Sequence, residues 1–381
     1  MSRRTTRAAA RAAAAKPTTL PQKRKREEEP PAASEEPALK RRTVTRQPFD
    51  IGSQNAAHYG QDSPAAKTTQ ISQLSGHADL TVLQEISNQT TLRSKLRLPK
   101  GKLMLDGPIF RSGSYVEHQP VIYSASTFAK PPNLYYFKDN STDTTVKIPR
   151  RASEEDRTII FGSQRKAEEG ITATGKKAFP ARPTSFWKGK LEPDEQGVQR
   201  RVIVMNIHTS PSGSLPDQAS TIRQQMEHLS HLYPERPVIA SGDFYLQRGA
   251  RKAFGELERS TQSGGEEQLF AAKVSHGRSS GYAQTNFPNT GAGQAADLSI
   301  ARRAQHATEP LRGHTEVFSA PRGAPIDTRS GVNAEGKRLK KMSIDHVAVR
   351  THVELPSPVG RDGPKNLHSQ AKSLTHKGRK G

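Results

Sequence analysis

The sequence predicts an α/β protein, and three neighbouring segments carry that prediction. Residues 202–207 are apolar and rich in β-branched side chains, which is typical of a buried strand. Residues 214–233 place apolar side chains at alternating steps of four and three, which predicts a helix with one apolar stripe. Residues 238–240 predict a second strand. The two strands lead to His208 and Asp243, and chemistry in α/β proteins gathers at such carboxyl ends.

The composition indicates that part of the 381-residue chain lies outside a folded core. Only 32% of the residues are apolar, and 29 Gly and 27 Pro are present. We predict one folded domain over residues 48–355, with disordered basic tails over 1–47 and 356–381. The absence of Cys excludes disulfides and thiolate metal sites. No apolar run approaches the length of a membrane-spanning helix, and we expect a monomer without a transmembrane segment.

The chain is strongly basic, with 59 Lys and Arg against 37 Asp and Glu and a formal net charge of +22. This excess predicts DNA or another phosphate-rich polyanion as the partner, although a solvated basic surface without a specific partner remains the alternative. Residues 23–26 and 40–42 are basic clusters separated by an acidic, Pro-containing spacer, the form of a bipartite nuclear-localisation signal. We expect a nuclear location, with a cytoplasmic one as the alternative.

Further elements follow from local patterns along the chain. Pro120 indicates a bulge or an edge within the strand expected over 115–123. Residues 260–290 and 302–342 are typical of loops. The other expected strands are 49–51, 78–85, 134–137, 158–161, 296–300 and one beginning at 343, and the other expected helices are 65–74 and 250–257.

Acidic residues and histidines recur where these expected strands begin or end. They are Glu85, Glu117, His208, Asp243, Asp297, Asp345 and His346, with Asn55 as a further candidate. Because no thiolate is present, oxygen and imidazole groups favour Mg²⁺, Mn²⁺ or Ca²⁺. Hydrolysis of a phosphate ester needs a metal, a group that positions water and a proton-transfer group, and such residues can supply all three. Each residue alone is more often a solvated cap or a surface group, so their recurrence carries the prediction.

The motifs stand in an order that resembles the endonuclease/exonuclease/phosphatase superfamily over residues 48–355. The resemblance rests on residues 83–85, 206–208, 242–244 and 343–346, with Asp297 in a short strand. Within the superfamily, the chain resembles pancreatic-type deoxyribonuclease and the active subunit of cytolethal distending toxin. The resemblance implies an α/β four-layer sandwich, in which two mixed, mostly antiparallel sheets pack face to face with helices outside.

The resemblance also implies a metal site and a first catalytic pair. Glu85 would bind Mg²⁺, with help from Asn55 and Asp345. Asn55 departs from the family pattern in its neighbour, because the Trp-Asn of the family is Gln-Asn here. His208, oriented by Glu117, would act as general acid or base.

Three further residues receive catalytic roles from the same resemblance. Asp243 would position the attacking water. His346, paired with Asp297, would stabilise the pentavalent phosphate. A carboxylate beside an imidazole fixes its tautomer and favours its protonated form, which suits both roles.

The implied substrate-binding residues include one clear departure from the family. Residues 113–117 resemble a deoxyribonuclease segment whose Tyr contacts DNA, and residues 181–183 resemble a segment whose Arg contacts phosphate. Tyr245 stands where the family has Asn, and a phenol offers one hydroxyl and more bulk than an amide. The site therefore works with altered geometry or is weakened. The implied substrate-binding residues are Arg182, Tyr115, Asn206 and Tyr245.

Three functions remain open at this point. The first is a Mg²⁺-dependent DNA endonuclease, either an effector or toxin delivered to a host nucleus or an intracellular nuclease of a eukaryote. The second is a phosphoinositide phosphatase, whose basic tails would hold an anionic membrane. The third is a catalytically weakened polyanion-binding protein, for which Tyr245 is the main argument.

Overall fold

The structure is a computed structural model, and it describes part of the chain. The described residues are 45–61, 63, 65–112, 115–135, 153, 185–209, 215–244, 255–276, 279–282, 285, 296–318 and 346–358. Contacts divide the chain into Met1–Thr43 and Val44–Gly381, and every described residue belongs to the second unit. The basic clusters at 23–26 and 40–42, the strand expected at 158–161 and the tail after residue 358 lie outside the described residues.

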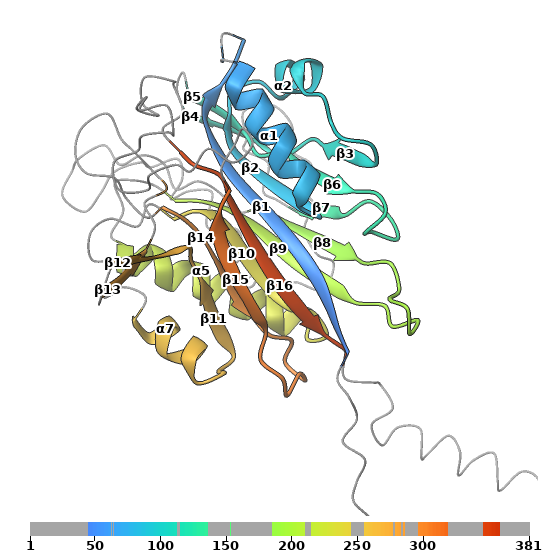
Figure 1. The fold of residues 1–381 in the computed structure, drawn as a ribbon, viewed down its shortest axis with the longest axis vertical. Coiled ribbons are helices and arrows are strands. Elements are labelled where there is room, and N and C mark those ends of the chain that lie inside the picture. Colours follow the sequence, from blue (N-terminus) through green and yellow to red (C-terminus); the bar gives the residue numbers. More distant parts are fainter. Residues whose placement is uncertain are drawn as a thin grey trace, which may run out of the picture. The chain divides into compact units, whose positions relative to one another are not determined.

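The first sheet is built around one long strand, β1, and its parallel neighbour β2 (Figure 1). The other pairings are antiparallel. Along the main path the strands are β15 (Arg312–Val317), β16 (Val349–Pro356), β1 (Arg46–Tyr59), β2 (Leu80–Ile86), β5 (Tyr115–His118) and β4 (Ile109–Ser112), while β6 (Val121–Ser124) pairs with β2 and β3 (Lys102–Leu105) pairs with β6.

The second sheet has six strands and is likewise mixed. Only β9 and β10 are parallel among its pairs, and the others are antiparallel. The order is β11 (Glu267–Phe270), β14 (Asp297–Arg302), β10 (Val238–Asp243), β9 (Arg201–His208), β8 (Ser185–Lys190) and β7 (Asn133–Tyr135). A separate hairpin pairs β12 (Lys273–His276) with β13 (Ser279–Tyr282).

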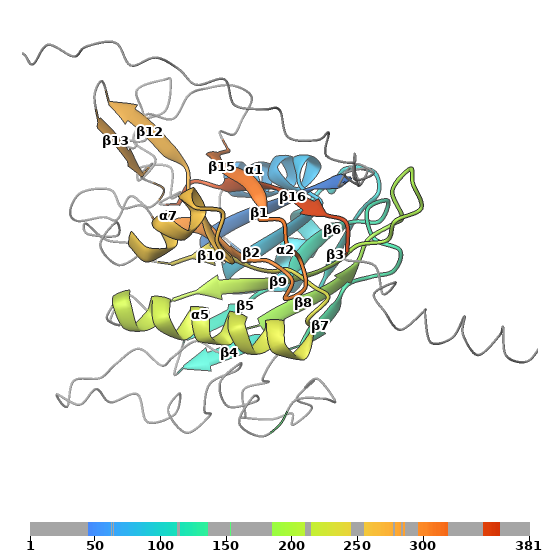
Figure 2. The same ribbon diagram turned by 90° about the horizontal axis from the view of Figure 1, so that it is seen from below.

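Helices cover the outer faces of the two sheets (Figure 2). The helix α1 (Ala65–His77) packs on β1 and β2, and α5 (Leu215–Leu232) packs on β10 and β14. The shorter helices are α2 (Gln89–Lys95) and α7 (Gly255–Gln262). Buried apolar residues of both sheets form one cluster between them, including Phe49, Ile51, Val82, Trp187, Val204 and Ile239. The expected four-layer sandwich of two mixed, mostly antiparallel sheets is confirmed.

Several expected elements need correction. The strand expected over 115–123 is two strands, because Gln119 and Pro120 interrupt it and both parts pair with β2. Residues 260–290 are not mostly loop, since β11 to β13 lie there. Residues 302–342 contain β15, an edge strand with exposed polar side chains that give no apolar alternation in the sequence. The helix expected over 250–257 extends to Gln262 in its described part.

The ends of the folded part meet through β1 and β16. Arg46 pairs with Pro356 in register, so β1 begins two residues before the predicted start at residue 48. The buried Arg200 guanidinium donates to the Thr45 carbonyl at 3.0 Å and pairs with Asp194 at 2.5 Å. The predicted domain limits themselves remain predictions. Among the described helices, none combines the length and hydropathy that a membrane crossing requires.

Candidate active site

Three adjacent strands of the second sheet bring three candidate residues side by side. Asp243, the last residue of β10, is the register partner of His208 on β9 and of Asp297 on β14. Register partners on neighbouring strands point to the same face of a sheet. All three side chains are buried. The strand ends that the sequence predicted therefore converge at one edge of this sheet.

Gly242 allows Asp243 to reach this position. Its φ is +150°, and a Cβ placed on it would lie 2.0 Å from the carbonyl oxygen of Ile207. Only a residue without a side chain tolerates both the backbone conformation and the close approach of β9. The Gly-Asp pair is therefore a requirement of the parallel β9–β10 contact that sets Asp243 beside His208.

Glu85 also stands in an unusual backbone conformation, at the end of β2 in the first sheet. Its φ is +55°, which is uncommon for a residue with a side chain. Its backbone N–H donates to Oε1 of Glu117 at 3.3 Å. Strained residues of this kind concentrate at functional sites, because only a surrounding structure that over-determines them keeps them in place.

The first imidazole–carboxylate pair joins the two sheets. Nδ1 of His208 lies 2.7 Å from Oε1 of Glu117 on β5. The same oxygen accepts from Nε2 of Gln119 at 3.1 Å, and Oε1 of Gln119 accepts from the Ser185 hydroxyl at 3.0 Å. A carboxylate at Nδ1 keeps a proton on that nitrogen and leaves Nε2 to face the site. The relay from Ser185 fixes the direction of this carboxylate.

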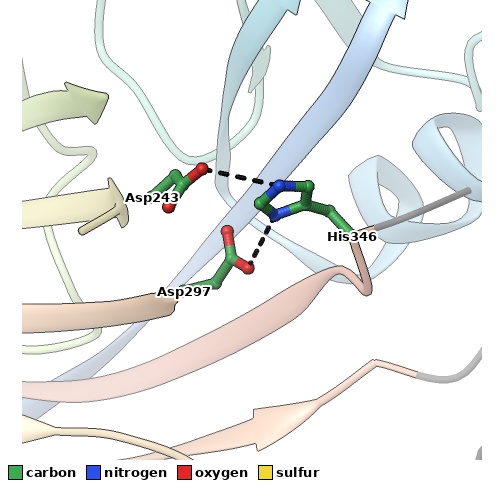
Figure 3. A group of neighbouring side chains, drawn as sticks. All are labelled: Asp243, Asp297 and His346. Carbon is green, nitrogen blue, oxygen red and sulfur yellow. Dashed lines mark hydrogen bonds and ion pairs between the residues drawn. The ribbon is translucent and has the colours of Figure 1, made fainter. Parts of the chain in front are cut away.

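The second pair links β14 to His346, which lies three residues before β16 (Figure 3). Nδ1 of His346 lies 3.3 Å from Oδ2 of Asp297, while Oδ1 of Asp297 has no hydrogen-bond partner among the described residues. Burial raises the pKa of Asp297 to about 6 and the nearby Asp243 carboxylate adds to the rise, while His346 opposes it. The Asp297 carboxyl is therefore less firmly held as an anion than a surface carboxyl would be.

Both pairs present Nε2 to one oxygen atom, Oδ2 of Asp243. Its distance is 3.6 Å to Nε2 of His346 and 4.0 Å to Nε2 of His208. It also accepts a hydrogen bond of 2.9 Å from the side chain of Asn55 on β1. Oε1 of Glu85 lies 3.2 Å from Nε2 of His208. The arrangement can hold a water on Asp243 with an imidazole on either side.

The donor set fits a divalent metal ion. The four carboxylates of Glu85, Glu117, Asp243 and Asp297 are buried around two imidazoles, so among the described residues of the site the acidic groups outnumber the basic ones. Such an excess in a buried site favours a cation with oxygen ligands. Within the described part of the chain, Asp243, Asp297 and His346 also lie close enough to share one ion, with ligand atoms within 4.8 Å of one another.

Asn206 lies at the junction of the sheets and bridges them. Its amide donates to the Leu83 carbonyl at 3.0 Å and accepts from the Gln84 side chain at 2.7 Å. Both contacts reach across to β2 and tie the strand that carries Glu85 to the strand that carries His208. Asn206 was expected to bind substrate, and the structure shows it in a bridging position.

The sequence did not indicate two other residues that hold the site. Gln119 and Thr285 are both buried. The Thr285 hydroxyl accepts from the backbone N–H groups of Ala296 and Asp297 at 2.9 Å each, and its carbonyl accepts from Val347. Thr285 therefore positions both halves of the second pair. Gln119 follows Glu117 by two residues, which was the one signal for it, whereas Thr285 stands in a segment expected to be loop.

Four of the expected site residues lie wholly or partly outside the described part of the chain. Arg182, Tyr245 and Asp345 lie outside the described residues. Tyr115 is the first residue of β5, and only its backbone is described. Their assignments remain predictions.

Comparison with known proteins gives matches to solved structures. No protein-family model matches the chain, and no curated protein does. An endonuclease/exonuclease/phosphatase family protein from Bacteroides thetaiotaomicron matches with 12% identity and a TM-score of 0.46, covering 82% of this chain and 99% of that one. A mannosyl-6-phosphatase from the same organism matches with 11% identity and a TM-score of 0.43, covering 80% and 99%.

A third match is TDP2 from D. rerio complexed with a single strand DNA product. It has 12% identity and a TM-score of 0.42, and it covers 80% of this chain and 98% of that one. These sequence identities and TM-scores are low, and the function proposed below is based on the side-chain geometry of this chain. In its fold, the chain is similar to solved structures of the endonuclease/exonuclease/phosphatase family.

Proposed function

We propose that the protein is a divalent-metal-dependent phosphoesterase, and specifically an endonuclease that hydrolyses phosphodiester bonds in DNA. One observation carries the proposal. A single oxygen of Asp243 faces Nε2 of both His208 and His346, and each imidazole has a carboxylate at its other nitrogen. Phosphoryl transfer needs a positioned nucleophile between groups that move protons and stabilise charge, and this arrangement supplies them.

Each described catalytic residue has its own role in the proposed reaction. Asp243 accepts a hydrogen bond from the attacking water and directs its oxygen at phosphorus. His346, held by Asp297, donates from Nε2 to a non-bridging oxygen and balances the growing negative charge. His208, held by Glu117, transfers a proton at Nε2. Nε2 of His208 lies 3.2 Å from Oε1 of Glu85, the carboxylate that we assign to the metal.

Glu85 and Asn55 are the described residues that would hold the metal, with Asp345 as the third. When bound, a divalent ion would neutralise charge on the phosphate oxygens. Asp243, Asp297 and His346 are assigned to the reaction rather than to the ion, because the roles above use the Oδ2 and Nε2 atoms that these side chains turn toward one another. Mg²⁺ suits this oxygen-rich set, and Mn²⁺ or Ca²⁺ has the same ligand preference.

Charge supports a nucleic-acid substrate. The net charge of +22 favours binding to a phosphate backbone, largely without regard to sequence. The basic clusters at 23–26 and 40–42 support a nuclear location, including that of a host cell entered by a delivered effector or toxin. The same site could hydrolyse phosphoinositides, and this is the alternative outcome of the test.

The test compares two substrates under matched conditions. Supercoiled plasmid and a short-chain phosphoinositide are each incubated with the full chain, with Mg²⁺ or with chelator. We expect nicked plasmid with Mg²⁺ only. Phosphate release from the lipid with plasmid left intact would replace the nuclease with a lipid phosphatase. Inactivity on both substrates, in protein shown to be folded by circular dichroism, would favour a polyanion-binding protein.

A further inference from the structure

A cavity at the far end of the second sheet is lined by cationic side chains. Its volume is about 280 Å³, and the described residues that line it include Lys130, Lys188, Lys190, Arg201 and Arg236 and no acidic residue. Arg201 begins β9 and His208 ends it, so at about 3.3 Å per residue the cavity lies roughly 23 Å from the candidate active site. It is a separate feature from that site.

The cations of this cavity have too few carboxylates to balance them. Arg201 and Arg236 share one oxygen, Oε1 of Glu235, at 3.3 and 3.2 Å. Lys130 and Lys190 make no side-chain hydrogen bond or ion pair with the described residues. Burial lowers the pKa of Arg236, Glu235 opposes that, and the charge of Arg201 lowers it further. The cavity therefore keeps an uncompensated positive potential, which favours an anion.

Two of the cations are held in place before any ligand arrives. The Lys188 ammonium lies 4.9 Å from the ring centre of Tyr135 and 4.7 Å from that of Tyr233. Nη1 of Arg236 donates to the Gly189 carbonyl at 3.0 Å, and the Arg236 side chain is buried. Groups fixed in this way lose little conformational entropy on binding. The aromatic contacts hold Lys188 without neutralising it.

We propose that this cavity binds a small ligand that carries two or more phosphate groups, such as a nucleoside polyphosphate or an inositol polyphosphate. The number of cations exceeds what one phosphate needs, and the volume approaches that of pockets for small ligands. Lys and Arg bind phosphate through charge-assisted hydrogen bonds. A polynucleotide would need a groove that follows its backbone, whereas the described lining forms one compact depression that is partly open to solvent. The site does not depend on the function proposed above.

The test measures binding of inorganic pyrophosphate by calorimetry. The full chain carries His208→Ala and is kept in EDTA, so that hydrolysis and a metal site do not contribute. We expect saturable binding to one site at about 150 mM NaCl. Lys188→Gln/Lys190→Gln should weaken it about tenfold or more, because two charge-assisted contacts are lost.

The control double variant is Lys95→Gln/Lys100→Gln, which removes the same charge from α2 and the turn after it. Its affinity should stay within about twofold of the parent, since screened charges at a distance contribute little. Lys130→Gln/Lys190→Gln is a second cavity variant that leaves the Lys188 contacts with the two tyrosines intact. Equal losses in cavity and control variants, or no saturable binding, would overturn the site.

Separate titrations with ATP and inositol hexakisphosphate then identify the source of the phosphates by the tighter affinity. Binding of a short DNA duplex without binding of pyrophosphate would assign the lysines to a nucleic-acid surface and overturn the proposal. With His208 intact, Lys188→Gln/Lys190→Gln should cleave plasmid within about twofold of wild type, because the cavity lies far from the reacting groups. A parallel loss of cleavage and pyrophosphate binding would also overturn it.

Discussion

The two imidazole–carboxylate pairs look alike in sequence but differ in how firmly their carboxylates are held. The His208–Glu117 distance is 2.7 Å, and Oε1 of Glu117 also accepts from the Glu85 backbone and the Gln119 side chain. The His346–Asp297 distance is 3.3 Å, and the part of the chain that the structure describes offers no partner to the second oxygen of Asp297. The first pair is therefore the more firmly held, and in the second pair burial raises the pKa of Asp297 to about 6.

This difference suggests that the two histidines have different tasks. A general acid or base must offer one nitrogen at a fixed place, and three donors on a single carboxylate oxygen secure that for His208. Stabilisation of charge on the phosphate would use one donor, Nε2 of His346, whose contact with its supporting carboxylate is the longer of the two.

Replacing His208 or Asp243, whose side chains meet in the candidate active site, should lower the cleavage rate most. His208→Ala and Asp243→Asn should each lower the rate of phosphodiester hydrolysis by about 10²- to 10⁴-fold, because proton transfer and water positioning are lost. The measurement is plasmid cleavage under single-turnover conditions. Circular dichroism and DNA binding should stay as in wild type. Near-normal rates in either variant would show that the reacting groups are elsewhere.

Exchanging each carboxylate for its amide compares the two pairs directly. Glu117→Gln should slow cleavage on the order of 100-fold, because the amide disturbs the tautomer of His208. Asp297→Asn should slow it on the order of 10-fold, because the contact that it alters is longer and less supported. The two variants serve as matched controls for each other. Equal losses would mean that the two pairs contribute alike.

The rate at which the wild-type protein cleaves plasmid should fall as the pH decreases through about 6. Burial raises the pKa of Asp297 to about 6, and its protonation removes the anion that faces His346. Asp297→Asn should lose this part of the pH–rate profile, whereas Glu117→Gln should retain it. A fall at the same pH in Asp297→Asn would assign the titration to another group.

Stability should respond to the same group with a defined sign. The pKa of Asp297 is higher in the folded protein than in the unfolded chain, so the folded state binds the proton more tightly. Its contribution to stability is present at low pH and is lost as the pH rises through about 6. In EDTA, the free energy of unfolding of Asp297→Asn relative to wild type should therefore increase between pH 5 and pH 7. Urea titrations at both pH values measure this difference, and a decrease would contradict it.

The smallest effect on the cleavage rate is expected for Gln119 and Ser185, which support the carboxylate of the His208–Glu117 pair. Gln119→Leu should slow cleavage by about three- to tenfold, because Glu117 keeps two of its three donors. Ser185→Ala should have a smaller effect, since it acts through Gln119 alone. Steady-state rates against pH check both. A loss from Gln119→Leu as large as that from Glu117→Gln would show that the relay, rather than the carboxylate, sets the imidazole.

Much of the fold and of the site could be predicted because the information is local. Residues 202–207 and 238–240 are continuous apolar strands, and the structure places both in the second sheet. The residues that end them, His208 and Asp243, are register partners. Parallel neighbours joined by a helix bring their carboxyl ends together, so a pattern in the sequence becomes a position in space.

The remaining features depend on contacts between distant parts of the chain. Gln119 gains its role only when Ser185 of the other sheet approaches it. Thr285 acts by joining the start of β14 to Val347, which no local pattern encodes. The strand β15 is polar and exists because β16 pairs with it. Local propensity is a weak guide where tertiary pairing decides.

The Asn206 bridge has a consequence for how the protein loses function. Glu85, Glu117 and Asn55 come from the first sheet, and His208, Asp243 and Asp297 come from the second. The site exists only while the two sheets stay in register, and the Asn206 amide ties them beside it. Any partial opening of the sandwich separates the imidazoles from their supports before either sheet unfolds. Enzymatic activity would then depend on the packing of the two sheets against each other. It should be lost at a lower denaturant concentration than the strand structure of either sheet.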